Sequence, residues 1–161
     1  MARVLVTGMS GTGKSTALDA LGALGYRVVE SDEPGWKEWV GGEELWREQP
    51  MADLLAQDDT PSLYVSGCVA NQGRFYDRFD AVVLLSAPAS VLLERIAKRT
   101  TNGFGKDPGE RDQILRDLAD IEPLLRATAT HELDATRPLD WVVGELVRIG
   151  AGQAEPSSPS E

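Results

Sequence analysis

The sequence has a single cysteine, a single histidine and no long apolar run. Cys68 therefore has no partner for an internal disulfide, and a metal site built from several cysteines or histidines is excluded. The apolar runs fall far short of the roughly 18 residues that a membrane-spanning helix needs. The first predicted strand begins close to Met1, which leaves little sequence for a secretion signal. We therefore expect a cytoplasmic protein that does not bind membranes.

Basic residues are also scarce, because 16 lysines and arginines face 26 aspartates and glutamates, for a formal net charge of −10. A general nucleic-acid-binding protein needs a basic surface, so this class is excluded. The charge is uneven: residues 30–59 are strongly acidic, whereas residues 95–116 are mainly basic. A chain of 161 residues suffices for one domain with a sizeable core. We expect that domain over residues 1–149, followed by a disordered, polar tail over residues 150–161.

What the sequence does contain is a glycine-rich segment, Gly8 to Ser15, that directly follows an apolar run and precedes a helical pattern. Its spacing is G-x-x-x-x-G-K-[ST], the phosphate loop. The glycines let the backbone approach an anion closely, and the free N–H groups at the start of the helix form a cradle for phosphate. Lys14 is expected to act on the β- and γ-phosphates, and Ser15 to ligate Mg²⁺. The residues predicted to bind a nucleoside triphosphate are Gly8, Met9, Ser10, Gly11, Thr12, Gly13, Lys14, Ser15 and Thr16.

Apolar runs alternate with helical patterns along the rest of the chain. Strands are predicted at 4–7, 26–29, 63–65, 81–85 and 132–133, and helices at 15–24, 43–56, 88–99, 114–125 and 139–149. Pro50 is expected to break one of these helices and Pro123 to kink another. The alternation predicts an α/β fold with a parallel sheet and right-handed crossovers. Ligands are then expected beyond the carboxyl ends of the strands.

Asp32 ends the second predicted strand, at the edge of the sheet where the phosphate loop also lies. A carboxylate there can orient or deprotonate an acceptor hydroxyl, or hold a water on Mg²⁺. The alternative is an aspartate that caps the turn before Pro34. We favour the functional interpretation, which makes Asp32 a predicted catalytic, acceptor-binding and metal-site residue.

Three tryptophans, Trp36, Trp39 and Trp46, lie in the acidic segment. They form either a stacking wall for a ring-bearing ligand or a small satellite core. Both interpretations stay open, with Trp36 as the best candidate for contact with the acceptor. Cys68 is predicted to be a buried small hydrophobic residue, because no histidine is nearby in the sequence to activate its thiol.

Arg95 and Arg99 are four residues apart on one predicted helix, so their side chains share a face. Phosphoryl transfer needs positive charge around the transferring group, and arginine offers a permanently charged donor fork. The alternative is a solvated helix end whose arginines pair with Glu94. Together with the phosphate loop, the pair favours a role at the nucleotide, with Arg99 as a catalytic residue.

In these features the chain resembles the P-loop kinases of the adenylate kinase, shikimate kinase and gluconate kinase group. Besides the phosphate loop, the resemblance rests on the ends of the second and third strands, the arginine pair and a late loop, which are Glu30–Asp32, Ser66–Gly67, Glu94–Arg99 and Asp134–Pro138. The family implies a three-layer P-loop NTPase fold with a five-stranded parallel sheet in the order 2-3-1-4-5. It also implies an acceptor-binding segment at about 32–59 and a lid at about 99–111.

The resemblance also implies roles for single residues. By position, Arg95 would lie near the adenine and Arg99 would reach the transferring phosphate. Arg137 and Pro138 would belong to the loop that lies against the adenine. Ser66 stands where the family has an aspartate, so a second carboxylate contact to Mg²⁺ must come from elsewhere, and Asp32 is the candidate.

The acceptor-binding segment departs from nucleoside-monophosphate kinases, which supply several arginines to a charged acceptor. Here the segment offers Arg47 with Lys37, and Arg74 from farther along the chain. Because like charges in a closed site repel by several kcal/mol, this segment favours a neutral or cationic acceptor. A sugar, an aminocyclitol or a nucleoside fits this description.

We therefore predict an ATP-dependent, Mg²⁺-requiring kinase that transfers the γ-phosphoryl group to a small molecule. One alternative is a nucleoside-monophosphate kinase of the adenylate type, in which the acceptor is itself a nucleotide. Another is a nucleotide-binding switch that hydrolyses ATP slowly. Either a monomer or a homodimer is compatible with the sequence.

Overall fold

The protein is described by a computed structural model, which covers residues 2–57, 62–98 and 108–152. Its main sheet contains five parallel strands: β1 (Arg3–Thr7), β2 (Arg27–Glu30), β5 (Leu63–Ser66), β6 (Ala81–Ser86) and β7 (His131–Asp134). They are arranged in the order β2-β5-β1-β6-β7. Counted without the two strands of a separate hairpin, this is the predicted order 2-3-1-4-5, and the predicted fold class is confirmed.

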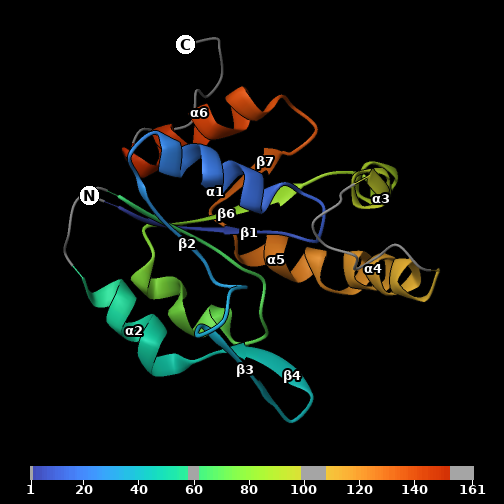
Figure 1. The fold of residues 1–161 in the computed structure, drawn as a ribbon, viewed down its shortest axis with the longest axis horizontal. Coiled ribbons are helices and arrows are strands. Elements are labelled where there is room, and N and C mark those ends of the chain that lie inside the picture. The colour runs from blue at the N-terminus through green and yellow to red at the C-terminus, as the bar shows by residue number, and fades with distance from the viewer. Residues whose placement is uncertain (1, 58–61, 99–107, 153–161) are drawn as a thin grey trace.

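Helices lie on both sides of this sheet (Figure 1). Helices α1 (Lys14–Ala23) and α6 (Leu139–Gly150) cover one face, and α2 (Glu48–Ala56) and α5 (Glu122–Thr128) cover the other. The strands carry side chains to both layers: along β1, Val4 and Val6 belong to one apolar cluster and Leu5 to the other. A 3₁₀ helix, η1 (Gln72–Arg78), joins the second cluster through Phe75.

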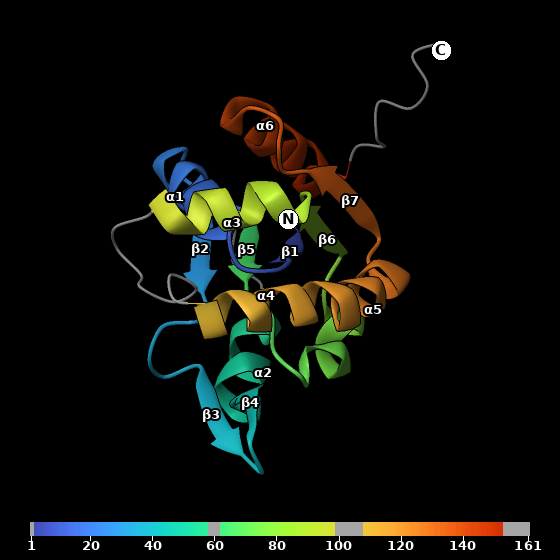
Figure 2. The ribbon, with the colours of Figure 1, turned by 90° about the vertical axis from the view of Figure 1, so that its right-hand side faces the viewer.

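The carboxyl ends of the strands face the viewer in Figure 2. Helices α3 (Ala89–Lys98) and α4 (Pro108–Asp120) cross in front of this edge, and a β-hairpin projects below it. The edge is therefore flanked by the two helices and the hairpin. None of the helices in the described parts of the chain combines the length and the apolar character of a bilayer span.

The hairpin corrects the predicted helix over residues 43–56. Strands β3 (Lys37–Val40) and β4 (Glu43–Trp46) pair antiparallel, and α2 begins only at Glu48. The turn consists of Gly41 and Gly42, which have φ angles of 61° and 83°. A two-residue hairpin turn with positive φ at both positions favours Gly-Gly, so a signal for the hairpin was present in the sequence. The helical spacing of the leucines beyond the hairpin obscured it.

The two prolines act at helix beginnings. Pro50 lies in the first turn of α2, where a missing N–H is tolerated, so the predicted break within a helix is wrong. Near Pro123 the predicted kinked helix is divided in two, because α4 ends at Asp120 and α5 begins at Glu122. The remaining predicted strands and helices are confirmed to within a few residues. Most of the predicted lid, residues 99–107, lies outside the described residues, as do Arg99 and residues 153–161 of the predicted tail; Pro108 to Arg111 begin α4.

Candidate functional site

The phosphate loop connects the carboxyl end of β1 to α1, as its position in the sequence predicts. Gly8 has a φ of 149°, and a Cβ there would come within 2.5 Å of the carbonyl oxygen of Leu85. Gly13 has a φ of 92° directly before the helix. Side chains at these positions would strain the backbone, so the loop depends on glycine to hold its shape.

The Lys14 side chain folds back over this loop. Its Nζ donates to the carbonyl oxygens of Gly8, at 2.7 Å, and Met9, at 3.1 Å. The Thr12 hydroxyl also donates to the Met9 carbonyl, at 2.9 Å. The ammonium group is therefore held over the loop, where a bound phosphate would meet both it and the backbone N–H groups.

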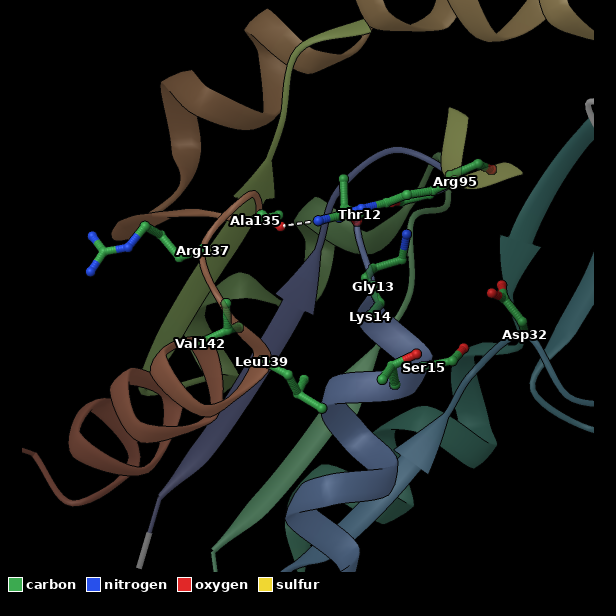
Figure 3. A pocket seen from close by; sticks show the side chains of 13 residues that line it. Thr12, Gly13, Lys14, Ser15, Asp32, Arg95, Ala135, Arg137, Leu139 and Val142 are labelled. Carbon is green, nitrogen blue, oxygen red and sulfur yellow. Dashed lines mark hydrogen bonds between the residues drawn. The ribbon is translucent and has the colours of Figure 1, made fainter. Parts of the chain in front are cut away.

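A cavity of about 560 Å³ opens over the loop and brings several predicted residues together (Figure 3). It is lined by Ser10, Gly11, Thr12, Gly13, Lys14, Ser15, Thr16, Asp32, Arg95, Ala135, Arg137, Leu139 and Val142. Three predicted nucleotide-binding residues of the described chain are not among them. Gly8 and Met9 contribute carbonyl groups beneath the cavity, and Pro138 precedes the first residue of α6.

Arg95 connects three parts of the cavity wall. Its guanidinium donates to the carbonyl oxygen of Ala135, at 2.6 Å, and to that of Gly11, at 3.3 Å (Figure 3). The side chain thus ties α3 both to the phosphate loop and to the loop after β7. Arg137 has a different environment: its guanidinium lies 4.4 Å from the ring centre of Trp141 and points away from Lys14.

Three apolar lining residues were not predicted as site residues: Ala135, Leu139 and Val142. They lie opposite the polar phosphate loop, on the loop after β7 and on the first turn of α6. Leu139 and Val142 are three residues apart and therefore share a helix face. This spacing, next to the predicted adenine loop, was the signal that could have identified them.

Asp32 follows β2 and lies across the cavity from Ser15 (Figure 3). Its side chain is 61% exposed, and Oδ1 accepts a hydrogen bond from the Lys37 ammonium at 3.2 Å. Lys37 also pairs with Glu44 at 2.8 Å. Burial lowers the pKa of Lys37, but the hydrogen bond that it donates to Glu44 and the charge of Asp32 outweigh this effect and raise the pKa above its usual value. In the described part of the chain, Asp32 bonds to this ammonium and to no backbone group of the turn before Pro34.

Cys68 follows the end of β5. Burial raises the pKa of its thiol above the usual range, the Lys14 charge and a hydrogen bond to Thr7 lower it, and the charges of Asp32 and Asp117 raise it further. The pKa of the thiol therefore responds to the charge of Lys14 in the phosphate loop and to that of Asp32. It is partly buried and packs against the main apolar cluster, in agreement with the predicted hydrophobic role.

The three tryptophans of the acidic segment have separate environments. Trp46 is fully buried, 5.6 Å from Phe75 between ring centres, and packs in the apolar cluster that also contains Leu5 of the main sheet, so it is a core residue of the domain. Trp36 packs partly buried against the same cluster, whereas Trp39 is 70% exposed. None of the three is among the residues that line the cavity in the described chain.

The two arginines predicted to bind the acceptor also lie outside the cavity lining. Arg47 donates to the carbonyl oxygen of Gly35 at 3.1 Å. Arg74 pairs with Glu48 at 2.9 Å, and both side chains of this pair are largely exposed. Within the described chain, the structure therefore brings neither arginine into the cavity beside Asp32.

The protein oxygens available for a cation are few. The described residues contain no group of three or more acidic, histidine or cysteine side chains that is placed to hold a metal ion. Ser15 and Asp32, a hydroxyl and a carboxylate, line the same cavity. Such a sparse set of oxygens fits Mg²⁺, which usually keeps several waters and shares its coordination with substrate phosphates.

Comparisons with known proteins agree with this geometry. Residues 4–116 match the family described as AAA domain. Shikimate kinase 2 of Yersinia enterocolitica is 29% identical over 169 residues, which cover 93% of this chain and 96% of that protein. Shikimate kinase of Salinibacter ruber is also 29% identical, over 96% of this chain and 87% of its own length.

Solved structures share the fold at lower identity. Shikimate kinase from Acinetobacter baumannii in complex with shikimate has a TM-score of 0.65 and 15% identity, with 94% of each chain covered. A gluconokinase from Sinorhizobium meliloti 1021 has a TM-score of 0.57 and 24% identity, again with 94% of each chain covered. The chain belongs to the AAA domain family, and it is a P-loop kinase that resembles shikimate kinases in sequence and in fold.

Proposed function

We propose that this kinase uses Mg²⁺ and ATP to phosphorylate a hydroxyl group of a neutral or cationic small molecule. The observation that carries the proposal is that Lys14, Ser15 and Asp32 line one cavity. The first two are suited to hold the triphosphate and its cation, and the third to orient the hydroxyl that attacks. A kinase needs these functions within reach of one another, because phosphoryl transfer is catalysed mainly by positioning and charge.

The donor nucleotide would occupy the side of the cavity formed by the phosphate loop, Arg95 and α6. Backbone N–H groups of the loop and the Lys14 ammonium would bind the phosphates. The base would lie between the Arg95 guanidinium and the apolar surface of Leu139 and Val142, because a flat aromatic ring suits such a slot. Arg137 would contribute from the rim. Arg99 and the lid remain proposals from the sequence.

The Ser15 hydroxyl and the Asp32 carboxylate would hold the magnesium, either directly or through its waters. The cation would neutralise charge on the phosphate oxygens as the γ-phosphoryl group moves. Asp32 would also accept the hydrogen bond of the acceptor hydroxyl and keep it aimed at the γ-phosphorus. Ser66 offers no carboxylate, so among the described residues of this edge Asp32 would be the one to serve both partners.

The charge of the acceptor side supports a neutral or cationic acceptor. Asp32 lines the cavity, and Glu44 shares the Lys37 ammonium with it. This one ammonium serves both carboxylates, and Arg47 and Arg74 lie outside the cavity lining. An anionic acceptor would meet uncompensated negative charge, which costs several kcal/mol in a closed site.

The experiment is to measure ADP formation from ATP and Mg²⁺ with pools of candidate acceptors. The pools are sugars, aminocyclitols and aminoglycosides, nucleosides, nucleoside monophosphates, and the hydroxy acids shikimate and gluconate; Lys14→Ala provides the blank. We expect one of the first three pools to stimulate ADP formation. Stimulation by a nucleoside monophosphate or a hydroxy acid alone would refute the charge argument, but the proposed kinase activity would stand. Slow hydrolysis that no pool changes would favour a nucleotide-dependent switch.

A further inference from the structure

A single ammonium group joins Asp32, which lines the cavity, to the neighbouring hairpin, whose Lys37 and Glu44 are not themselves among the lining residues. Lys37 is the first residue of β3, and its Nζ lies 3.2 Å from Asp32 Oδ1 and 2.8 Å from Glu44 Oε2. Asp32 follows β2 of the main sheet, whereas Glu44 lies on β4 of the hairpin. The ion pair therefore links the proposed acceptor-orienting carboxylate to the hairpin beside it.

Buried hydrogen bonds fix this hairpin to the edge of the main sheet. The indole N–H of Trp46 donates to the Ser31 hydroxyl at 2.7 Å, and that hydroxyl donates to the Ser66 carbonyl at 2.6 Å. The backbone N–H of Trp46 donates to Asn71 Oδ1 at 2.8 Å. Trp46 is also the cross-strand partner of Lys37. The lysine is thus attached to a rigid support rather than to a mobile surface loop.

This arrangement differs from an ordinary surface ion pair. Such pairs are worth about 0–1 kcal/mol because both groups are solvated. The Lys98–Glu94 pair on α3 is of that kind, with side chains that are 75% and 65% exposed. The Lys37 side chain, by contrast, is only 18% exposed and meets two carboxylates. Its position is therefore better defined than that of a solvated lysine.

The ion pair of Lys37 and Asp32 leaves one hydrogen-bond donor and one acceptor for a ligand. An ammonium has three N–H donors, and two of those of Lys37 are engaged by carboxylates. Within the described residues, neither the third donor nor the Oδ2 atom of Asp32 has a hydrogen-bond partner, and the Asp32 side chain is 61% exposed. Because Nζ lies 3.2 Å from Oδ1 of the same carboxylate, the remaining donor and the remaining acceptor are neighbours and suit the two oxygens of adjacent hydroxyl groups.

We propose that Lys37 is a specificity-determining residue, which donates to one hydroxyl of a vicinal diol while Asp32 accepts from its neighbour. The acceptor class is then a neutral polyhydroxylated molecule, such as a sugar or a cyclitol. The inference rests on the proposed function and refines it. The same site disfavours a carboxylate at this position, because two carboxylates already share the one ammonium.

The test compares acceptor-dependent ADP formation by the wild type, Lys37→Met and Lys98→Met. The first variant removes the donors and keeps most of the stem, and the second removes a matched lysine from an exposed ion pair on α3. The probes are D-glucose, myo-inositol and their monodeoxy forms. Lys37→Met is expected to raise the KM for the best probe about 10-fold to 100-fold, the effect of losing a hydrogen bond to a charged group. The KM for ATP should stay within about twofold in both variants.

The monodeoxy probes test direct contact. In the wild type, one deoxy form should lose about 10-fold or more in kcat/KM, because a charged donor then lacks its partner. In Lys37→Met the same deoxy form should lose nothing further. A deoxy effect of equal size in both proteins, or an equal rise of both KM values, would overturn the inference and leave Lys37 a structural residue.

Two further outcomes separate the inference from the function on which it rests. If Lys37→Met does not fold, as judged by its melting transition, Glu44→Gln takes its place, because it removes one anchor of the ammonium and keeps the donors; an unchanged acceptor KM there would overturn the inference. If the neutral probes fail and shikimate or gluconate stimulates ADP formation, the kinase stands and the inference fails. If Mg²⁺ and ATP do not bind at all, the proposed function itself fails.

Discussion

The two sides of the cavity are built by different means. The donor side is one continuous segment, Gly8 to Thr16, whose shape comes from glycine backbone angles and from lysine hydrogen bonds to its own carbonyl groups. The acceptor side depends on Asp32, which lines the cavity and is tied by an ion pair to Lys37 and Glu44 of a hairpin that folds near the end of β2. A local backbone motif can be recognised in a sequence, whereas a cluster formed by side chains of separate strands depends on the tertiary fold.

The largest effect is expected on the donor side. Replacing Lys14 by alanine removes the ammonium held over the phosphate loop, and we expect kcat to fall by about 10²-fold to 10³-fold, as for other preorganised charge-stabilising donors. Turnover of ATP with the stimulating acceptor measures it, with the melting temperature as a control for folding. Unchanged turnover by a folded variant would remove the phosphate loop from the mechanism.

On the acceptor side, Asp32→Asn is expected to separate binding from transfer. Phosphoryl transfer should fall by about 10²-fold, the lower end of what general base catalysis contributes, because an amide cannot accept the hydroxyl proton. ATP affinity in the absence of Mg²⁺, measured by titration calorimetry, should change by less than about twofold. The control is Asp53→Asn, on the outer side of α2, where the carboxylate bonds to Gln49. If transfer survives in Asp32→Asn, the carboxylate serves only to hold Lys37.

The same contrast explains how much could be predicted from the sequence. The parallel sheet and the phosphate loop follow from apolar runs and a motif with fixed spacing, both of which are local, whereas the strand order came from the resemblance to P-loop kinases. The hairpin was missed because the apolar positions near Trp46 and Leu54 also fit a helix, and tertiary packing decided between the two periods. Lys37 was noted only as a basic residue of the acceptor-binding segment, and nothing in the sequence indicated its pairing with Asp32. Its role depends on a strand pairing that places it beside Asp32.

The anchor of the hairpin offers a smaller, structural test. Trp46→Phe keeps most of the buried ring but removes the N–H that donates to the Ser31 hydroxyl. We expect the free energy of unfolding to fall by about 1–3 kcal/mol, the cost of leaving a buried polar group without its partner. Trp39→Phe is the control, because Trp39 is 70% exposed and its loss should change stability by less than about 0.5 kcal/mol. Urea denaturation measures both, and equal losses would contradict the buried anchor.

The smallest expected effect concerns Cys68, whose thiol pKa is influenced by the charges of both Lys14 and Asp32. Its raised pKa keeps the thiol protonated, so alkylation by iodoacetamide at pH 8 should be several-fold slower in the folded protein than in urea, and should accelerate as the pH rises. The stability contributed by the buried neutral thiol is complete below the pKa of the unfolded chain and is lost as the pH rises toward that of the folded chain.

Lys14 and Asp32 are expected to change the alkylation rate of Cys68 in opposite directions. The Lys14 charge lowers the pKa of Cys68, and that of Asp32 raises it. Lys14→Ala should therefore slow the alkylation further, and Asp32→Asn should accelerate it, when rates are compared at one pH by mass spectrometry. Bound ATP would act like the lysine substitution, because its phosphates neutralise the same charge. Identical rates in the three proteins would mean that neither the Lys14 charge nor the Asp32 charge acts on the Cys68 thiol.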